Sequence, residues 1–397
     1  MRSIRIAVSA IGAVILGLLV WLAIQPPQRP QASARIDSLP VDRTIDGFAR
    51  AFEPRPLVFP ADHGPHPEYQ TEWWYYTGNL QDAAGQQFGY QFTIFRRALT
   101  AEPVTRASSL ASNQLYFAHF ALTDIGARRH IAAEKFSRGA GGLAGACARG
   151  AAIPCDDYAS FRAFIEDWSV TALDDEGNEV RIIARHENHR VDLTLRAVKP
   201  AVLHGDRGHS PKGTEPGNAS FYYSLTRLQT EGEVIFDGNK HTITGSSWMD
   251  HEWSTSALGE NALGWDWFSI QLDDQRELML FQIRNTDGSL ELASSGTLVD
   301  AAGQTTHLTV DDFILEAQDR WRSPVTGGEY PARWIIRIPE QDIELTVEAR
   351  LPEQEMNVSI VYWEGAIRVT GTASGQAVTG QGYLEMTGYA QSINGKF

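Results

Sequence analysis

The sequence lacks the common signatures of catalytic and nucleotide-binding sites. It contains no GxSxG nucleophile elbow, no GxxxxGK[ST] phosphate-binding loop and no CxxC metal-binding pair. These absences argue against a serine esterase of the elbow type, a P-loop nucleotide hydrolase and a CxxC zinc module. Any chemistry must therefore come from other polar residues.

Basic residues are scarce relative to acidic ones. The 34 Lys and Arg residues face 49 Asp and Glu residues, which gives a net charge of −15. A surface of this charge repels phosphate backbones and anionic membranes. We therefore expect no nucleic-acid partner.

Cysteine is nearly absent, since Cys147 and Cys155 in "CARGAAIPC" are the only two in the chain. In an exported protein, one close pair predicts a disulfide across a small loop. The alternative is a pair of free thiols.

One long uncharged run lies at the N-terminus, at residues 6–24, behind two arginines. Its nineteen apolar-rich residues just span a bilayer, and the arginines favour an N-terminus held inside. The "ASA" at Ala32–Ala34 is a plausible cleavage sequence. We expect residues 1–24 to be a signal peptide or signal anchor and residues 25–55 to be a linker. The body is then expected in the periplasm, anchored in the inner membrane by residues 6–24 if the signal is retained.

Helical periodicity is almost absent beyond that segment. Alternating apolar and polar residues, typical of half-buried strands, mark Phe88–Arg97, Val191–Val198 and Ile343–Leu351. Turn sequences such as "DDEGN" and "FDGNK" separate the strand-like runs. The body is predicted to be all-β.

The chain also repeats itself loosely. "WWYYTGNLQD" (Trp73–Asp82) aligns with "WDWFSIQLDD" (Trp265–Asp274), and "TGSSWMD" (Thr244–Asp250) aligns with "TGQGYLE" (Thr379–Glu385). Each half thus opens on a Trp-rich hairpin and closes on a Thr-Gly-x-x-aromatic strand.

This repeat predicts two tandem antiparallel barrels or closed sandwiches. In the alignment Asp250 falls over Glu385. The boundary is expected near residues 254–263, with an N-terminal domain at 56–256 and a C-terminal domain at 257–397.

Two segments interrupt the strand pattern. The Gly/Ala-rich stretch Arg138–Cys155 is expected to be a clipped loop. The polar, glycine-rich stretch His204–Asn218 is either a floppy linker or a lid at a barrel mouth.

Two clusters combine acids with aromatic residues. In "SSWMDHEWSTS" (Ser246–Ser256), a strand would place Trp248, Asp250 and Glu252 on one face. If that face looks into a barrel, one of the two carboxyl groups must hold a proton at neutral pH. Such an acid could protonate an alkene or a leaving group while the rings stabilise a developing cation. An outward-facing, salt-bridged trio with His251 is the alternative.

The second cluster is "DHGPHPEYQTEWWYY" (Asp62–Tyr76), in which Glu72 precedes four consecutive aromatic residues. Its alternative interpretation is an entry segment that plugs the end of a barrel. A metal site built from His251 with His63 or His66 has no supporting ligand spacing, so we expect neither a metal nor a cofactor.

Four motifs carry a family likeness: "HPEYQTEWWYYTGNL", "HGDRGHSPKG…NASFYYSLTRL", "TGSSWMDHEWSTS" and "YWEGAIRVTG…GQGYLEMTGY". With them the chain resembles the AttH-like predicted secreted hydrolase family, which is related to carotenoid 1,2-hydratases of the CrtC type. The resemblance implies two tandem lipocalin-like barrels and a small apolar substrate, isoprenoid or lipid-like. It also implies that the protein works with an ABC-type export permease.

Two functions follow from the resemblance. The first is a hydratase or hydrolase in which Asp250, in the matching WMD segment, is the acid. In this hypothesis His251, Glu252 and Glu72 complete the catalytic group. The residues expected to bind substrate are Trp73, Trp74, Tyr75, Trp248, Trp253, His204 and Tyr222. The second function is a non-catalytic carrier of a hydrophobic ligand that works with a membrane transporter.

Overall fold

The computed structural model describes residues 45–102, 108, 111–155, 159–255, 258–259 and 261–391, which belong to one compact unit. The expected signal or anchor (1–24) and residues 25–44 of the expected linker lie outside this part of the chain. Within it, no helix has the length and apolar character needed to cross a membrane. Its helical elements are the 3₁₀ turns Ala61–His63 and Pro339–Gln341. The all-β prediction is confirmed.

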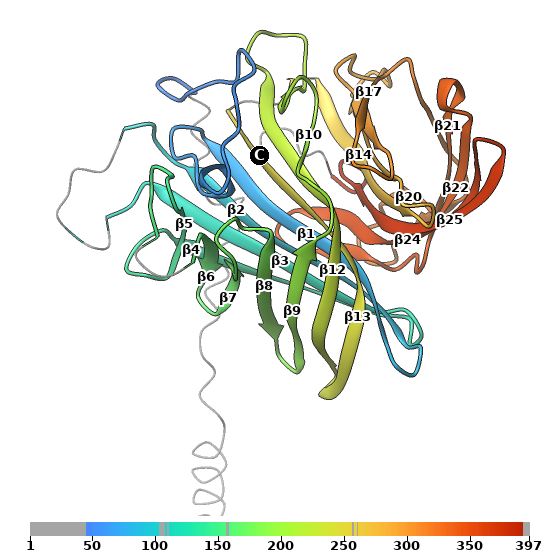
Figure 1. Cartoon of the computed structure of the whole chain (residues 1–397), viewed down its shortest axis with the longest axis horizontal. Helices are drawn as coiled ribbons and strands as arrows, with labels where there is room; N and C mark the ends of the chain where they lie inside the picture. Colours follow the sequence, from blue (N-terminus) through green and yellow to red (C-terminus); the bar gives the residue numbers. More distant parts are fainter. Residues whose placement is uncertain are drawn as a thin grey trace, which may run out of the picture. The chain divides into compact units, whose positions relative to one another are not determined.

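Thirteen strands form the first sheet, sheet A. They are β1 (Thr71–Asp82), β2 (Gln87–Ala98), β3 (Gln114–Asp124), β4 (Arg129–Arg138), β5 (Ala144–Ala148), β6 (Phe161–Ile165), β7 (Trp168–Ala172), β8 (Glu179–His186), β9 (His189–Ala197), β10 (Val202–Leu203), β11 (His209–Pro211), β12 (Ala219–Phe236) and β13 (Asn239–Ser254). Their order is β4-β3-β2-β1-β13-β12-β9-β8-β7-β6-β5, with β10 and β11 also paired to β12. The sheet curls until β6 contacts β2, β3 and β4, so sheet A is a nearly closed barrel (Figure 1).

Ten strands form the second sheet, sheet B. They are β14 (Ala262–Leu272), β15 (Glu277–Asn285), β16 (Ser295–Val299), β17 (Thr305–Thr309), β18 (Ile314–Ala317), β21 (Arg333–Ile338), β22 (Ile343–Ala349), β23 (Glu355–Asn357), β24 (Val361–Ala373) and β25 (Gln376–Met386). Their order is β17-β16-β15-β14-β25-β24-β22-β21-β18, with β23 on β24. β19 (Arg320–Arg322) and β20 (Glu329–Pro331) pair separately.

Alternation along the strands gives each sheet its own apolar core. In β1, Trp74 and Tyr76 are buried inside sheet A, and in β14, Phe268 and Ile270 are buried inside sheet B. Successive side chains of a strand point to opposite faces. The intervening residues of β1 and β14 are therefore available to contact the other sheet.

The outer faces of the two sheets pack on each other through a third apolar cluster. Tyr75 and Tyr222 enter it from sheet A, and Trp267 enters it from sheet B. The side-chain amide of Asn79 also donates to the backbone oxygen of Gly382 at 3.1 Å. The space between the sheets is therefore itself a core.

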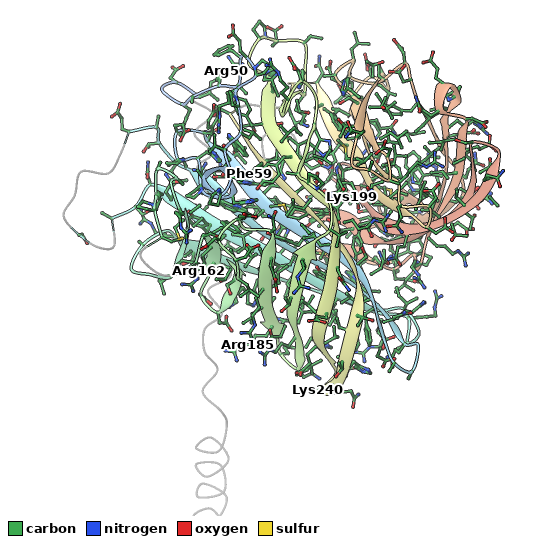
Figure 2. All side chains as sticks on the ribbon, in the orientation of Figure 1. Arg50, Phe59, Arg162, Arg185, Lys199 and Lys240 are labelled. Atoms are coloured by element: carbon green, nitrogen blue, oxygen red, sulfur yellow. A yellow bond between two sulfur atoms is a disulfide. The ribbon has the colours of Figure 1, made fainter. Side chains whose placement is uncertain are left out.

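A buried ion cluster adds to this interface. Glu277 of β15 accepts from Lys199 Nζ at 2.7 Å and from Arg227 Nε at 2.5 Å. Lys199, labelled in Figure 2, follows β9, and Arg227 belongs to β12, so the cluster ties sheet B to sheet A. The Glu277 side chain is fully buried.

The predicted repeat is confirmed by the strand pairing. β1 and β13 place Tyr75 opposite Asp250, and β14 and β25 place Trp267 opposite Glu385. The two strand pairs therefore have the same register, which agrees with the alignment of Asp250 with Glu385.

The two sheets follow one another along the chain. Sheet A ends at Ser254 and sheet B begins at Ala262, inside the interval 254–263 that was expected to hold the boundary. Because the sheets share a core, their division into two domains at 56–256 and 257–397 stays a prediction.

Two connecting segments are more ordered than expected. Within the expected linker, Ala51 is buried in the core of sheet A and its carbonyl accepts from His209 Nε2 at 2.9 Å. The expected loop 138–155 contains β5 and is closed by the Cys147–Cys155 disulfide. Backbone pairing and core contacts thus hold residues that composition alone assigned to coil.

Candidate active site between the two sheets

The alternation of β13 divides the expected catalytic group in two. Asp250 and Glu252 line a cavity between the sheets, with Trp248 in the apolar cluster beside them. His251 and Trp253 point the other way, into the interior of sheet A. Asp250 and His251 therefore do not share a cavity, because neighbouring strand residues face opposite sides.

The same alternation divides the aromatic stretch of β1. Trp73 and Tyr75 line the cavity, whereas Trp74 is buried inside sheet A. Glu72 is fully buried and bonded to His251, also inside sheet A. The expectation that Glu72, Trp74 and Trp253 share a substrate cavity with Asp250 is thus wrong.

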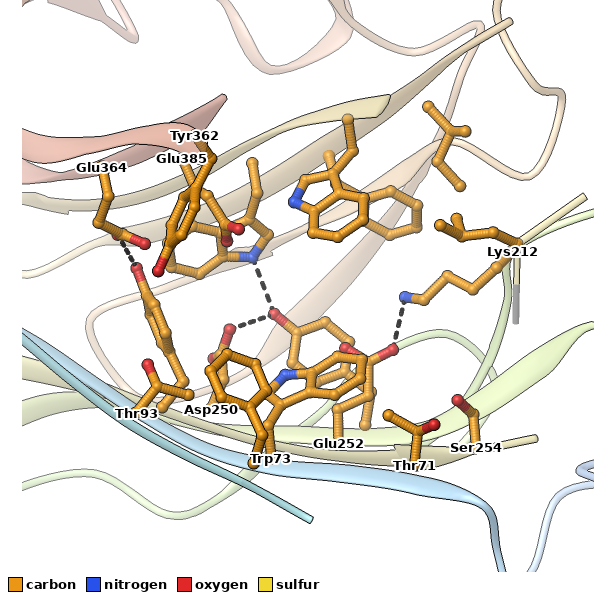
Figure 3. A pocket seen from close by; sticks show the side chains of 18 of the residues that line it. Thr71, Trp73, Thr93, Lys212, Asp250, Glu252, Ser254, Tyr362, Glu364 and Glu385 are labelled. Atoms are coloured by element: carbon orange, nitrogen blue, oxygen red, sulfur yellow. Dashed lines mark hydrogen bonds and ion pairs between the residues drawn. The ribbon is translucent and has the colours of Figure 1, made fainter. Parts of the chain in front are cut away.

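The cavity has a volume of about 120 Å³, close to the size that holds one aromatic ring. Its lining is largely aromatic, with four carboxyl groups and one amine. These residues are Trp73, Tyr75, Phe95, Tyr222, Trp265, Trp267, Phe281, Tyr362, Asp250, Glu252, Glu364, Glu385 and Lys212. Trp73, Leu258 and Trp265 are only half-buried, which places the rim of the cavity beside them. Figure 3 shows Asp250, Glu252 and Trp73 on one wall and Glu364, Glu385 and Tyr362 on the facing wall.

Asp250 is buried, and three groups donate to its carboxyl. Tyr222 Oη donates to Oδ2 at 2.6 Å, Trp248 Nε1 donates to Oδ1 at 2.6 Å, and the Ser224 hydroxyl also donates to Oδ1. Burial raises the pKa of Asp250 from 3.8 to about 7, although the three donors act in the opposite direction. At neutral pH this carboxyl can both give and take a proton.

His204 stands behind Ser224 rather than in the cavity. Its Nε2 lies 2.7 Å from Ser224 Oγ, and its Nδ1 lies 2.9 Å from Thr297 Oγ1. Burial and the charge of Lys212 hold the pKa of His204 well below its usual value, so the imidazole is neutral. His204 therefore contacts Asp250 through the Ser224 hydroxyl and does not line the cavity in which it was expected to bind substrate.

Lys212 brings the segment 204–218 to the cavity. Its Nζ lies 3.2 Å from Glu252 Oε1 and donates to Ser210 Oγ at 3.0 Å. The same ammonium lies 4.1 Å from the centroid of the Phe281 ring, a favourable cation–π geometry. Within the segment 204–218, Lys212 is the residue that lines the cavity.

The wall from sheet B carries two opposed carboxyl groups. Glu364 of β24 lies directly across from Glu385 of β25, and Tyr75 Oη donates to Glu364 Oε1 at 2.6 Å. Burial, together with the charge of Glu385, holds the pKa of Glu364 well above its usual value. Burial also raises the pKa of Glu385 to about 8, although a hydrogen bond from Trp265 lowers it. Both groups are therefore mainly protonated at neutral pH.

Glu72 belongs to a separate ionic network inside sheet A. Its Oε1 accepts from His66 Nδ1 at 2.8 Å and from His251 Nε2 at 2.9 Å. Its Oε2 accepts from Arg96 Nε at 2.7 Å. Burial would raise the pKa of Glu72, but Arg96 and His66 hold it well below its usual value. Glu72 is thus a paired, buried anion with no contact to the cavity.

His66, Glu72 and His251 have ligand atoms within 4.8 Å of one another, the spacing of a metal-ligand cluster. The Arg96 guanidinium already occupies one oxygen of Glu72, and His66 Nε2 bonds Asp62 at 2.9 Å. A cation in contact with the ligand carboxylate opposes a second cation there. These residues fit a hydrogen-bonded ion network better than a metal site.

A family model described as AttH-like matches residues 50–389. The chain belongs to the AttH-like family. The resemblance drawn from the four sequence motifs is therefore confirmed.

Solved structures agree with this AttH-like assignment. A Nitrosomonas europaea protein assigned as AttH is 33% identical, with a TM-score of 0.73, and the match covers 86% of this chain and all of the other. Kievitone hydratase from Nectria haematococca is 15% identical, with a TM-score of 0.64, over 87% of this chain and 98% of the other. CghA bound to Sch210972 is 12% identical, with a TM-score of 0.54, over 86% and 96%. The last two show a shared fold. A comparison with curated proteins found no match.

The sequence analysis missed eight aromatic or charged groups of this AttH-like cavity: Phe95, Trp265, Trp267, Phe281, Tyr362, Glu364, Glu385 and Lys212. The repeat contained a signal for two of them, since it aligned Asp250 with Glu385 and the stretch containing Tyr75 with that containing Trp267. If one half of a duplicated chain carries site residues, the residues at the equivalent positions of the other half are candidates for the facing wall.

Proposed function

We propose that this AttH-like protein is an enzyme of the hydratase or hydrolase type, and that Asp250 transfers the proton to an apolar substrate in the cavity between the sheets. The observation that carries the proposal is the Asp250 carboxyl, buried in an aromatic cavity with its pKa raised to about 7. A general acid works best when its pKa lies near the working pH.

The step follows from the groups around Asp250. In a hydration, its proton goes to the less substituted carbon of a double bond, whose π electrons form the new C–H bond. The cation left on the other carbon would lie among the faces of Trp73, Tyr222 and Trp267, which favour positive charge. The oxygen of a water molecule then forms the C–O bond, and the surplus proton returns to Asp250. Glu252 is engaged with Lys212, so the proton is assigned to Asp250.

The fold shared with a protein named kievitone hydratase agrees with this proposal without identifying a substrate. Hydrolysis would use the same proton on a leaving-group oxygen instead of a carbon. Both reactions need an acid in a dry, cation-stabilising site.

The test uses α-methylstyrene, a ring-sized alkene that protonates to a tertiary benzylic cation. The full chain is incubated with it in isotopically labelled water, and the labelled tertiary alcohol is measured by mass spectrometry. We expect product from the wild type, loss of about 10²-fold or more in Asp250→Asn, and little loss in Asp266→Asn. Asp266 is a matched control because it is also a buried aspartate. It accepts hydrogen bonds from Gln282 and Arg284 and does not line the cavity.

A non-catalytic carrier of a hydrophobic ligand is the second candidate, favoured by the largely aromatic lining of the cavity. In that case the wild type and Asp250→Asn would bind α-methylstyrene equally and neither would form product. We propose an extracytoplasmic, periplasmic location for either function, which the Cys147–Cys155 disulfide supports. A membrane transporter stays our proposed partner for the carrier.

A further inference from the structure

Glu364 is a cavity carboxyl whose two oxygens differ in their partners. It is 1% exposed and lines the cavity. Its Oε1 accepts from Tyr75 Oη at 2.6 Å, whereas its Oε2 has no hydrogen-bond partner among the described residues. Buried polar atoms nearly always have a partner. An unpaired buried oxygen in the lining of a cavity indicates a group that forms its hydrogen bond with a ligand.

The charges around Glu364 decide which role Oε2 plays. Glu385 faces it from β25, and Asp250 lies near enough on the opposite wall to raise its pKa further. Both neighbours are acids, and both favour the protonated form of Glu364. Since Oε1 accepts from Tyr75, the proton belongs on Oε2. This oxygen therefore presents an O–H donor to the cavity.

We propose that Glu364 is a substrate-recognition residue that donates a hydrogen bond from Oε2 to an oxygen acceptor on the substrate. The substrate class is then an apolar molecule that carries a carbonyl, ether or hydroxyl oxygen beside its reacting part. The assignment of a reacting part rests on the proposed function, whereas the recognition of the oxygen does not.

The strand register places the two groups close together. Tyr75, which holds Glu364, is the cross-strand partner of Asp250. Glu364, the hydrogen-bond donor, and Asp250, the proton-transfer group, can thus contact the same small ligand from facing walls of a cavity of about 120 Å³. An oxygen and a double bond within one ring-sized unit would meet both groups.

The test compares two ligands of nearly the same shape, acetophenone and α-methylstyrene, which differ by a carbonyl oxygen in place of a methylene group. Their affinities for the full chain are measured by titration calorimetry. We expect the wild type to prefer acetophenone by about two- to tenfold, the usual net effect of one hydrogen bond. Glu364→Gln should keep this preference, because its amide oxygen can accept from Tyr75 while its NH₂ faces the cavity.

Removal of the donor needs a second change, because an unpaired Tyr75 hydroxyl could take its place. The comparison is therefore between Tyr75→Phe and the double variant Tyr75→Phe/Glu364→Met. The preference should persist in the first and disappear in the second, with the affinity for α-methylstyrene showing that the cavity is intact. Equal affinities in the wild type, no measurable binding of either ligand, or a preference that survives in the double variant would overturn the proposal.

Failure of the catalytic proposal is separable from failure of this one. A retained preference without turnover in the wild type would refute the enzyme and leave the recognition role standing.

Discussion

Tyr75 and Trp267 occupy equivalent positions in the two sheets, and their rings meet edge to face with centroids 5.2 Å apart. Each ring lies opposite an acid on the neighbouring strand, Asp250 for Tyr75 and Glu385 for Trp267. The two equivalent strand pairs thus meet face to face, with their aromatic residues and acids lining the same cavity.

The cavity is therefore a product of the duplication rather than of either barrel alone. The interior of sheet A is filled by its own apolar core, and sheet B is filled in the same way. What remains for a ligand is the space between the outer faces, where each copy contributes one carboxyl group at the equivalent position. The charge of Asp250 raises the pKa of Glu385 beyond the effect of burial.

Asp250 should make the stability of the protein depend on pH. Its pKa is about 7 in the folded protein and 3.8 ordinarily, so the folded state binds more protons between these values and stability falls as pH rises through them. Asp250→Asn lacks this effect. Its free energy of unfolding relative to the wild type should therefore increase by up to about 4 kcal/mol between pH 4 and pH 7. Urea unfolding at the two pH values measures the change, and a constant difference would contradict the raised pKa.

Ser224 should tune the pKa of Asp250. Its hydroxyl donates to Asp250 Oδ1 and lowers that pKa, so Ser224→Ala should raise it by about one unit. The infrared band of the protonated carboxyl, isolated as the difference between each protein and its Asp250→Asn derivative, reports the titration. Ser220→Ala is the matched control, because Ser220 is buried on the same strand and contacts Ser210 instead. If the pKa of Asp250 shifts in both variants or in neither, Ser224 does not specifically lower that pKa.

Much of the fold was predictable because it depends on local patterns. Period-two alternation and turn sequences identified strands, and the repeat aligned segments that the structure pairs in the same register, Tyr75 with Asp250 and Trp267 with Glu385. The pattern also placed Asp250 and Glu252 on one face, where the structure has them.

The errors in the site have two different physical origins. Grouping Glu72 with Trp73, and His251 with Asp250, overlooked the alternation itself, since adjacent strand residues cannot share a face. Glu364 and Lys212 were beyond prediction for another reason. Their places depend on how sheet B packs on sheet A and on the path of the segment 204–218, neither of which has a periodic signature in the sequence.

The ion cluster at Glu277 should contribute strongly to stability. Glu277 pairs with Lys199 and Arg227 at the interface of the sheets, and Glu277→Gln leaves these two partly buried cations without the charge that they share. A loss of about 3–5 kcal/mol in the free energy of unfolding is expected. The control is Glu316→Gln, whose exposed pair with Arg337 should contribute little in the same urea titration. Equal effects of the two substitutions would show that the cluster has no special role.

Glu72 should prove structural rather than catalytic. It holds His66, His251 and Arg96 inside sheet A, so Glu72→Gln should cost about 3–5 kcal/mol of folding stability. At a temperature where this variant stays folded, its cavity is unchanged. It should therefore hydrate α-methylstyrene and bind acetophenone within about twofold of the wild type, as expected for a group that touches no reacting atom. A folded Glu72→Gln protein as inactive as Asp250→Asn would instead place the network inside sheet A in the catalytic machinery, acting through the shared strand β13.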